Sequence, residues 1–322
     1  MKYAKIGGQA VIEGVMMRYG NDYAVTVRKP DGTLEVKKDR YESLVSRLHL
    51  THIPILRGVF AFIDSLVLGI STLTFSASFY DDEESPDKDS QKKGESTGEK
   101  VLMGVTVALS VVIAVGLFMI LPFFISGLFG RVTESSWLLG IIEGLVRVIL
   151  FMAYILLISR MKDIQRVFMY HGAEHKSINC IEHGAQLTPE NAMKYSRFHR
   201  RCGTSFLFIV IFLSIVFFIL FFQIFPVEHM ILKVIFRILL VPVIAGVAYE
   251  VIQWAGRSEC RFASVISRPG MALQKLTTRE PDLSMIEAAI ASIEAIYDWR
   301  AFQREELAGD GADSDGQAGA QA

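Results

Sequence analysis

The stretch VLMGVTVALSVVIAVGLFMILPFFISGLFG, residues 101–130, contains no charged side chain. A helix needs roughly 20 apolar residues to cross about 30 Å of hydrocarbon, so this stretch can span a membrane with length to spare. Three further stretches are candidate spans: residues 137–159, 204–225 and 231–252. The last is the weakest, because Lys233 and Arg237 lie in its first turns and Pro242 lies near its middle. Long cationic side chains can extend toward the interface, and membrane helices tolerate proline, so we predict four transmembrane helices.

The overall composition agrees with a membrane protein. The chain has 322 residues, of which 51% are hydrophobic and 21% charged, and its mean hydropathy of +0.36 argues against a purely cytosolic globular protein. Its 33 Lys and Arg residues against 34 Asp and Glu residues are too balanced for nucleic-acid binding, so no nucleic acid is expected as a partner. The three cysteines, Cys180, Cys202 and Cys260, are too few for a disulfide framework and favour reduced thiols or metal ligands.

The basic residues predict the orientation. The connection over residues 160–201 carries Arg160, Lys162, Arg166, Lys176, Lys194, Arg197, Arg200 and Arg201. The short loops near Arg131 and His229 carry almost none, so the connection should be cytoplasmic and both termini as well. We therefore expect a multi-pass protein in contact with a lipid bilayer.

Two charged groups fall within the predicted span 137–159. Glu143 and Arg147 stand four residues apart on one helix face, which allows an ion pair and lowers the cost of burying either side chain. This topology places Arg147 and Arg237 toward the outer half of the membrane. The pair either holds helices together or lines a polar cavity, and the sequence leaves both possibilities open.

Residues 58–79 are long enough to span but show a different pattern. One stripe of the predicted helix is apolar, and the opposite stripe, which contains Gly69, Thr72 and Ser76, is small and polar. A crossing here would also force the basic connection to the outside. The pattern therefore predicts an amphipathic helix in the membrane interface.

Outside the spans, three regions have distinct patterns. Polar and apolar residues alternate around the turn-forming dipeptide Asp31-Gly32, so we expect a hairpin, paired with a strand at Gln9–Met17. The segment DDEESPDKDSQKKGESTGEK, residues 81–100, lacks apolar residues and should be a solvated linker. Residues 285–301 show apolar spacing typical of a helix, with Ser284 as its expected N-cap.

The predicted fold class is a mainly α polytopic membrane protein with about four transmembrane helices, an amphipathic interfacial helix and a small N-terminal β element. The expected segments are an N-terminal cytoplasmic β-containing segment (1–57), the interfacial helix (58–79), a disordered acidic linker (80–100), the first transmembrane pair (101–159), a cytoplasmic connection that contains His and Cys (160–203), the second transmembrane pair (204–252), a C-terminal cytoplasmic helical segment (253–308) and a disordered tail (309–322).

The cytoplasmic connection holds four of the seven histidines: His171, His175, His183 and His199. The first two belong to the pattern H-x-x-E-H, and positions i, i+3 and i+4 of a helix point to one side. Two imidazoles and the carboxylate of Glu174 can therefore converge. Imidazole suits zinc and similar divalent ions, and a carboxylate that is not a ligand can act as a general base, the role predicted for Glu174.

A second pair of ligand types strengthens this prediction. His199 and Cys202 stand three residues apart where the chain re-enters the membrane, and zinc sites are commonly built from two such pairs separated by a loop. The competing interpretation is that His199 is an ordinary surface histidine and Cys202 a small apolar residue at a helix start. We predict a divalent metal, zinc in the first place, held by His171, His175 and His199. Cys202 is the candidate fourth ligand: its presence in the shell would favour a closed structural site, and its absence a catalytic one.

Several longer motifs identify a resemblance to a known family. They are GGQAVIEGVMMR (7–18), YHGAEHKSINC (170–180), HRRCGTSF (199–206), QWAGR (253–257) and PGMALQKLTTREPDLSMIEAAI (269–290). Together they resemble the bacterial membrane family DUF1385 over nearly the whole chain. Members are described as metal-dependent enzymes of the cytoplasmic membrane, so the resemblance implies that location and a metal site, but no particular reaction. Arg200 stands where the family often has proline in H-P-R-C-G, a departure that touches no expected ligand.

Two functions compete on these observations. The first is a membrane-embedded, metal-dependent hydrolase with Glu174 as its base. The second is a membrane assembly or regulatory protein in which the metal is structural and a protein partner binds at the cytoplasmic face. A transporter is third, because the spans carry few polar groups beyond Glu143, Arg147 and Arg237 that could line a path.

Overall fold

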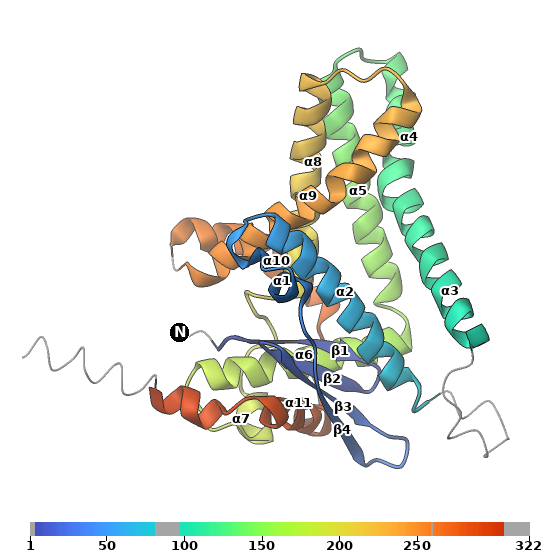
Figure 1. Cartoon of the computed structure of the whole chain (residues 1–322). Helices are drawn as coiled ribbons and strands as arrows, with labels where there is room; N and C mark the ends of the chain where they lie inside the picture. The colour runs from blue at the N-terminus through green and yellow to red at the C-terminus, as the bar shows by residue number, and fades with distance from the viewer. Residues whose placement is uncertain (1–3, 81–96, 259, 306–322) are drawn as a thin grey trace, which may run out of the picture.

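The computed structural model describes residues 4–80, 97–258 and 260–305. Long helices form a bundle at one end, and a sheet covered by shorter helices forms a compact unit at the other end (Figure 1). The structure is mainly helical with an N-terminal four-stranded sheet, so the predicted fold class is confirmed. Residues 81–96 of the expected linker and the tail at residues 309–322 lie outside the described residues. Helix α3 begins at Thr97, so it includes the last four residues of the expected linker, 97–100.

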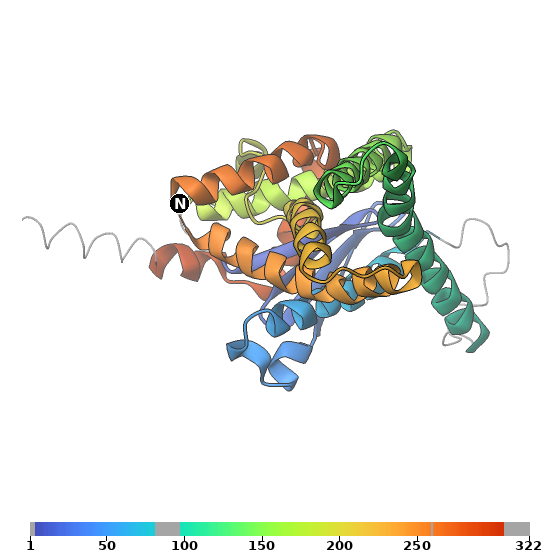
Figure 2. The ribbon, with the colours of Figure 1, turned by 90° about the horizontal axis from the view of Figure 1, so that it is seen from above.

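The four predicted spans are all long helices. They are α3 (Thr97–Val115) with the π-turn η3 (Gly116–Ile120), α4 (Leu121–Leu128) and η4 (Phe129–Arg131), then α5 (Ser136–Ile158), α8 (Gly203–Ile224) and α9 (Met230–Arg257). The π-turn comes just before Pro122, whose missing N–H cannot continue the ordinary helical pattern. Both views place α3 at the edge of the bundle, and its spanning window is only 6% buried (Figures 1 and 2). Such apolar exposure fits a helix that contacts lipid.

A fifth helix is also long and apolar enough to cross a membrane, namely α2 (Leu56–Ala77). Its buried side carries mostly small and polar residues, which pack on α9 and on the sheet: Gly58, Asp64, Leu68, Gly69, Thr72 and Ser76. A Cβ on Gly58 would lie 2.7 Å from the carbonyl oxygen of Gly246, so the two helices approach closely. The opposite side exposes Ile63, Leu66, Val67, Ile70 and Leu73. The small stripe thus contacts protein while the apolar stripe is free for lipid.

The N-terminal sheet is antiparallel in the order β1 (Ile6–Val11), β2 (Gly14–Tyr19), β3 (Asp22–Arg28) and β4 (Leu34–Arg40). The hairpin around Asp31-Gly32 is confirmed, with Gly32 at φ +84°. The single strand expected at Gln9–Met17 is wrong. That stretch is itself a hairpin, which turns at Ile12 and Glu13, and Glu13 has φ +50°. Glycine at position 14 lets β2 start directly against β3, because a side chain there would clash with the Thr26 carbonyl.

Two helices cover one face of this sheet, α6 (Lys162–Glu182) and α11 (Leu283–Ile296). The shared core includes Ile6, Val15, Met17, Tyr170, Ala173, Ile178, Ile286 and Ile293. The short helix α7 (Pro189–Met193) packs on α6 and α11, whereas α1 (Leu44–Arg47) and η1 (Leu50–His52) pack on α2. Helix α10 (Arg261–Thr277) packs on α8, α9 and α5 of the bundle. The N-cap of α11 is Asp282, which accepts from Met285 N at 2.9 Å, and not Ser284 as expected. Segments before, between and after the predicted spans therefore form one folded unit.

Candidate metal centre

Helix α6 presents the H-x-x-E-H motif toward the bundle. His175 and Glu174 are buried, with exposed fractions of 1% and 5%. Gly172, between them and His171, lies against the link from α10 to α11, where a side chain would clash with the Arg279 carbonyl. The motif is therefore enclosed between the sheet on one side and the start of the bundle on the other.

Cys202 reaches the same place from another element. It is the N-cap residue of α8, and its Sγ accepts from Thr204 N at 3.4 Å. The ligand atoms of His171, His175 and Cys202 all lie within 4.8 Å of one another, and His171 Nε2 is 3.1 Å from Cys202 Sγ. The structure thus brings together two imidazoles and one thiol that could hold a metal ion.

Both imidazoles are oriented by backbone carbonyls. His171 Nδ1 lies 2.8 Å from the oxygen of Thr277, and His175 Nδ1 lies 2.7 Å from the oxygen of Arg197. Carbonyl oxygens only accept, so each Nδ1 carries a proton, and Nε2 is the nitrogen of each ring that can bind a metal in the space beside Cys202. Histidines that bind metals are typically held by such a hydrogen bond from the other ring nitrogen.

The charges of the three groups are coupled. Burial disfavours the charged form of His171, but the Cys202 thiolate outweighs it and raises the pKa of His171 to about 9. Burial likewise opposes ionisation of Cys202, yet His171 and His175 bring the pKa of that thiol well below its ordinary value. Without metal the site therefore favours a thiolate beside an imidazolium. The thiolate is the form of cysteine that binds metals.

Glu174 lies behind the triad and is not one of the three close ligand atoms. Burial raises the pKa of Glu174 despite the nearby His175 and His171, and the backbone N–H of Gly8 donates to its carboxylate. A Cβ on Gly8 would lie 2.5 Å from the Met16 carbonyl oxygen and 3.1 Å from Glu174 Cδ, whereas a Cβ on Gly7 would meet nothing within 4 Å. Glycine at position 8 is thus what allows β1 to approach Glu174.

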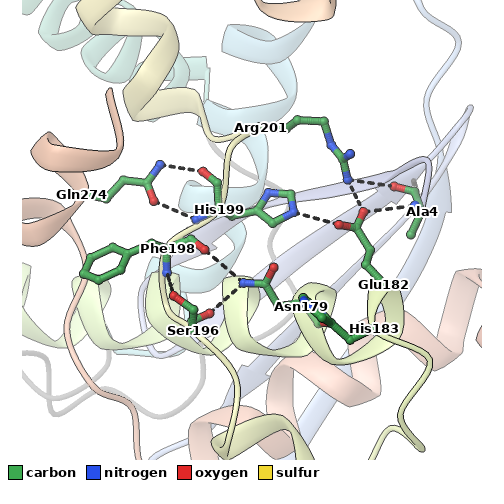
Figure 3. A network of polar contacts seen from close by, with 9 residues as sticks. All are labelled: Ala4, Asn179, Glu182, His183, Ser196, Phe198, His199, Arg201 and Gln274. Carbon is green, nitrogen blue, oxygen red and sulfur yellow. Dashed lines mark hydrogen bonds and ion pairs between the residues drawn. The ribbon is translucent and has the colours of Figure 1, made fainter. Parts of the chain in front are cut away.

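The structure gives His199, the remaining predicted ligand, a different partner. Its ring centroid is 5.7 Å from that of His175, but its Nε2 lies 3.2 Å from Glu182 Oε2 (Figure 3). Its backbone N donates to Gln274 Oε1 at 2.9 Å, and Gln274 Nε2 donates to its carbonyl at 2.7 Å. Arg201 and the backbone N–H of Ala4 also bind Glu182. This network ties α6, α8, α10 and the N-terminus together beside the triad.

The other candidates from the connection over residues 160–201 lie apart from the triad. His183 Nδ1 contacts the Asn179 carbonyl at 2.7 Å, and its ring packs on Tyr195. Cys180 is buried, which raises the pKa of its thiol to about 11. Neither residue belongs to the triad.

A cavity of about 520 Å³ is lined by residues next to the triad's hydrogen-bond partners, and not by His171, His175 or Cys202 themselves. Arg197 and Thr278 line it, and these residues supply or adjoin the carbonyls that orient His175 and His171. Lys275 and Arg279 line it as well. Glu280 provides the single carboxylate among the described residues of its wall. The cavity is therefore predominantly cationic.

The donor set fits a borderline divalent ion. Two imidazole nitrogens and one thiolate are ligands that zinc prefers, and three protein ligands leave one position of a tetrahedral site open. The set provides no hard oxygen cage of the kind that calcium or magnesium requires. The residues thus fit a zinc-type ion, and Glu174 is the carboxylate beside it.

Two comparisons with known proteins returned matches. Residues 53–299 match the family described as "Protein of unknown function (DUF1385)". An "Uncharacterized protein YqhQ" of Bacillus subtilis (strain 168) is 33% identical over 303 residues, which cover 93% of this chain and 94% of that protein. No solved structure matches. The descriptions of these matches name no metal-dependent activity.

Proposed function

The chain belongs to the DUF1385 family, and from that premise we propose that it is an integral membrane enzyme, a metal-dependent hydrolase. In this proposal His171, His175 and Cys202 hold a divalent metal, zinc in the first place, and Glu174 is the general base. When bound, such an ion supplies Lewis-acid chemistry and activates water at its open position. Glu174 would accept the proton, because its carboxylate lies beside the triad without being part of it.

One observation carries the proposal. Both Nδ1 atoms are committed to backbone carbonyls, so both Nε2 atoms are prepared to bind the same ion as Cys202 Sγ. A histidine pair with only a packing role would not need two separate carbonyls, from Thr277 and Arg197, to fix one tautomer each. The cationic cavity that Arg197 and Thr278 line favours a substrate with an anionic group.

A structural metal is the second candidate, and a specific observation favours it. The triad joins α6 to the start of α8, and its two carbonyl partners come from the end of α10 and the loop before α8. An ion here would tie the folded unit to the bundle. The chain would then be an assembly or regulatory protein with a protein partner at the cytoplasmic face, and His199 would be the ligand that closes the site.

Metal content of single variants tests the ligand set. Purified wild type should contain about one zinc per chain, and His175→Ala should contain almost none, because loss of one of three ligands removes most of the affinity. His199→Ala should keep the metal, since that side chain binds Glu182 instead. His183→Ala, which alters an exposed histidine of the same connection, is the matched control.

Each outcome has a clear meaning. If His199→Ala loses metal as completely as His175→Ala, the site has four protein ligands and the structural interpretation gains. If wild type holds no stoichiometric metal, or holds it after loss of His175, neither metal-based function survives.

We also propose that α2 lies in the membrane interface and that the folded unit is cytoplasmic. The sheet, before α2, shares one core with α6, after α5, and Glu13 of the sheet pairs with Arg166. Both must therefore be on the same side of the membrane, which requires an even number of crossings between them. If α3–α4 and α5 cross, α2 does not.

Thiol labelling tests this topology. Cys260 is exposed, whereas Cys180 and Cys202 are buried, so a membrane-impermeant maleimide reports on Cys260. We expect no labelling of intact cells and strong labelling after permeabilisation, because the start of α10 lies on the cytoplasmic side in this topology. Arg131→Cys, at the opposite end of the bundle, should react in intact cells when Cys260 is replaced by serine. Labelling of Cys260 in intact cells, without labelling of Arg131→Cys, would show the opposite orientation.

A further inference from the structure

A second cavity, of about 360 Å³, lies at the end of the bundle that faces away from the sheet (upper end in Figure 1). Residues of α4, α5, α8 and α9 line it, and its outer part includes Ser136, Gln223, Val227 and Lys233. Its walls are largely apolar and include Phe123, Ile215, Phe218, Ile219 and Phe222. The cavity is separate from the candidate metal centre, which lies at the other end of α8.

Three charged side chains meet at its base. Glu143 Oε1 accepts from Arg147 Nη2 at 2.8 Å, and Glu143 Oε2 accepts from Arg237 Nη2 at 2.6 Å. All three are buried, with exposed fractions of 6% for Glu143, 4% for Arg147 and 6% for Arg237. The ion pair expected between Glu143 and Arg147 is thus present, and Arg237 joins it. One carboxylate faces two guanidinium groups.

The two arginines are fixed where they are. Arg147 Nε donates to the Phe118 carbonyl at 3.0 Å, within the π-turn η3, and its Nη1 donates to Ser214 Oγ at 2.8 Å. Arg237 lies over the rings of Phe123 and Phe222, at 4.3 Å and 4.4 Å from their centroids. These contacts hold both guanidinium groups at the cavity and prevent them from extending to the membrane surface.

The charge around the cavity does not balance. Two arginines and one glutamate leave one positive charge, and the half-buried Lys233 adds another. Among the described residues that line the cavity, Glu143 is the sole carboxylate. An uncompensated charge within a membrane is unfavourable, so an anion that enters the cavity would offset that cost.

We propose that this cavity binds a phosphate-type anion, and that a phospholipid headgroup is its source. Guanidinium groups bind phosphate oxygens through paired hydrogen bonds. Every guanidinium nitrogen of Arg147 and Arg237 already donates one hydrogen bond within the protein, but each terminal Nη atom carries a second N–H group that can donate to an anion. The apolar walls and the position between transmembrane helices suit a headgroup whose acyl chains remain in the bilayer. A free phosphate has the same chemistry but gains nothing from those walls.

Lipid binding to the purified full chain tests the proposal. Delipidated protein in detergent is titrated with phosphatidylglycerol or with phosphatidylcholine of identical chains, and the complexes are counted by native mass spectrometry. We expect phosphatidylglycerol to bind at least about tenfold more tightly, because only it has a net negative charge. Inorganic phosphate serves as the competitor that separates the two sources.

Charge variants give the decisive comparison. Lys233→Gln, which removes a half-buried charge outside the hydrogen-bonded network, should weaken phosphatidylglycerol binding about fivefold, and Arg237→Gln by more. Glu143→Gln should strengthen it, since it increases the positive charge; a merely structural role for the network predicts no gain from any variant. Arg131→Gln removes a charge that is exposed at the same end of the bundle and should have little effect.

The results distinguish the alternatives. Preference for phosphatidylglycerol that falls in Lys233→Gln supports the lipid site. Binding of inorganic phosphate with no lipid preference, lost in the same variant, supports the anion site with a free anion as its source. Equal binding of both lipids without phosphate binding, or no difference between Lys233→Gln and Arg131→Gln, would overturn the proposal.

Discussion

Glu174→Gln should abolish the cellular function of the protein while its metal content and thermal stability stay close to wild type. Glutamine keeps the size of the side chain and can still accept the hydrogen bond from Gly8 N–H, but it cannot take up a proton. General-base catalysis typically contributes about 10²–10⁴-fold to the rate, so the loss should be near complete in a complementation assay of a deletion strain.

Two controls accompany this variant. Glu190→Gln makes the same change at an exposed carboxylate of α7, in the same connection, and should complement fully. Elemental analysis and thermal unfolding of purified Glu174→Gln protein separate lost chemistry from lost structure. A fully active Glu174→Gln protein with bound metal would end the hydrolase proposal and leave the structural metal in its place.

Removal of metal should produce the largest change in stability. An ion that binds only the folded chain stabilises it by about 4 kcal/mol when its concentration is 1,000 times Kd, so a strong chelator should lower the unfolding temperature markedly. The triad joins α6 to α8, so the effect should extend to the contact between the folded unit and the bundle.

A variant without the site checks that the chelator acts there. His171→Ala should unfold at the temperature of chelated wild type, and chelator should shift it no further. His183→Ala, with an exposed histidine outside the triad, should respond to chelator as wild type does. A chelator shift that persists in His171→Ala would place the stabilising ion elsewhere.

The sequence predicted the spans well because their signal is local. Residues 101–130 and 204–225 are apolar over the length of a membrane, and each position contributes independently of the fold. The strand expected at Gln9–Met17 failed for a local reason as well. No Asn-Gly or Asp-Gly dipeptide marks a turn at Ile12 and Glu13, and the left-handed backbone of Glu13 makes the stretch a hairpin.

The candidate site was predictable only in part. The spacing of His171, Glu174 and His175 on one helix face follows from helical geometry, and the structure brings Cys202 to them. The role of Thr277 cannot be inferred in that way, because a backbone carbonyl of a residue more than 100 positions away leaves no trace in its side chain. Gly8, within the motif at residues 7–18, makes a close backbone approach at Glu174.

His199 shows the limit of reasoning from ligand pairs. Its spacing to Cys202 is typical of zinc sites, yet its Nε2 lies 3.2 Å from Oε2 of Glu182, which belongs to the same helix as His175. Burial lowers the pKa of His199, and burial would raise that of Glu182, but His199 and Arg201 outweigh it and lower the pKa of the carboxyl. The sequence has carboxylates at both Glu174 and Glu182, and only the packing separates their roles.

X-ray absorption spectroscopy of the purified wild-type protein tests the central claim most directly, because it reports the atoms bound to the metal. The triad predicts one sulfur at about 2.3 Å and two imidazole nitrogens at about 2.0–2.1 Å from zinc, with one further light atom. The sulfur contribution should disappear in Cys202→Ser protein. A metal shell without sulfur in the wild-type protein, or a sulfur signal that remains after Cys202→Ser, would contradict the assignment of His171, His175 and Cys202 as the ligands.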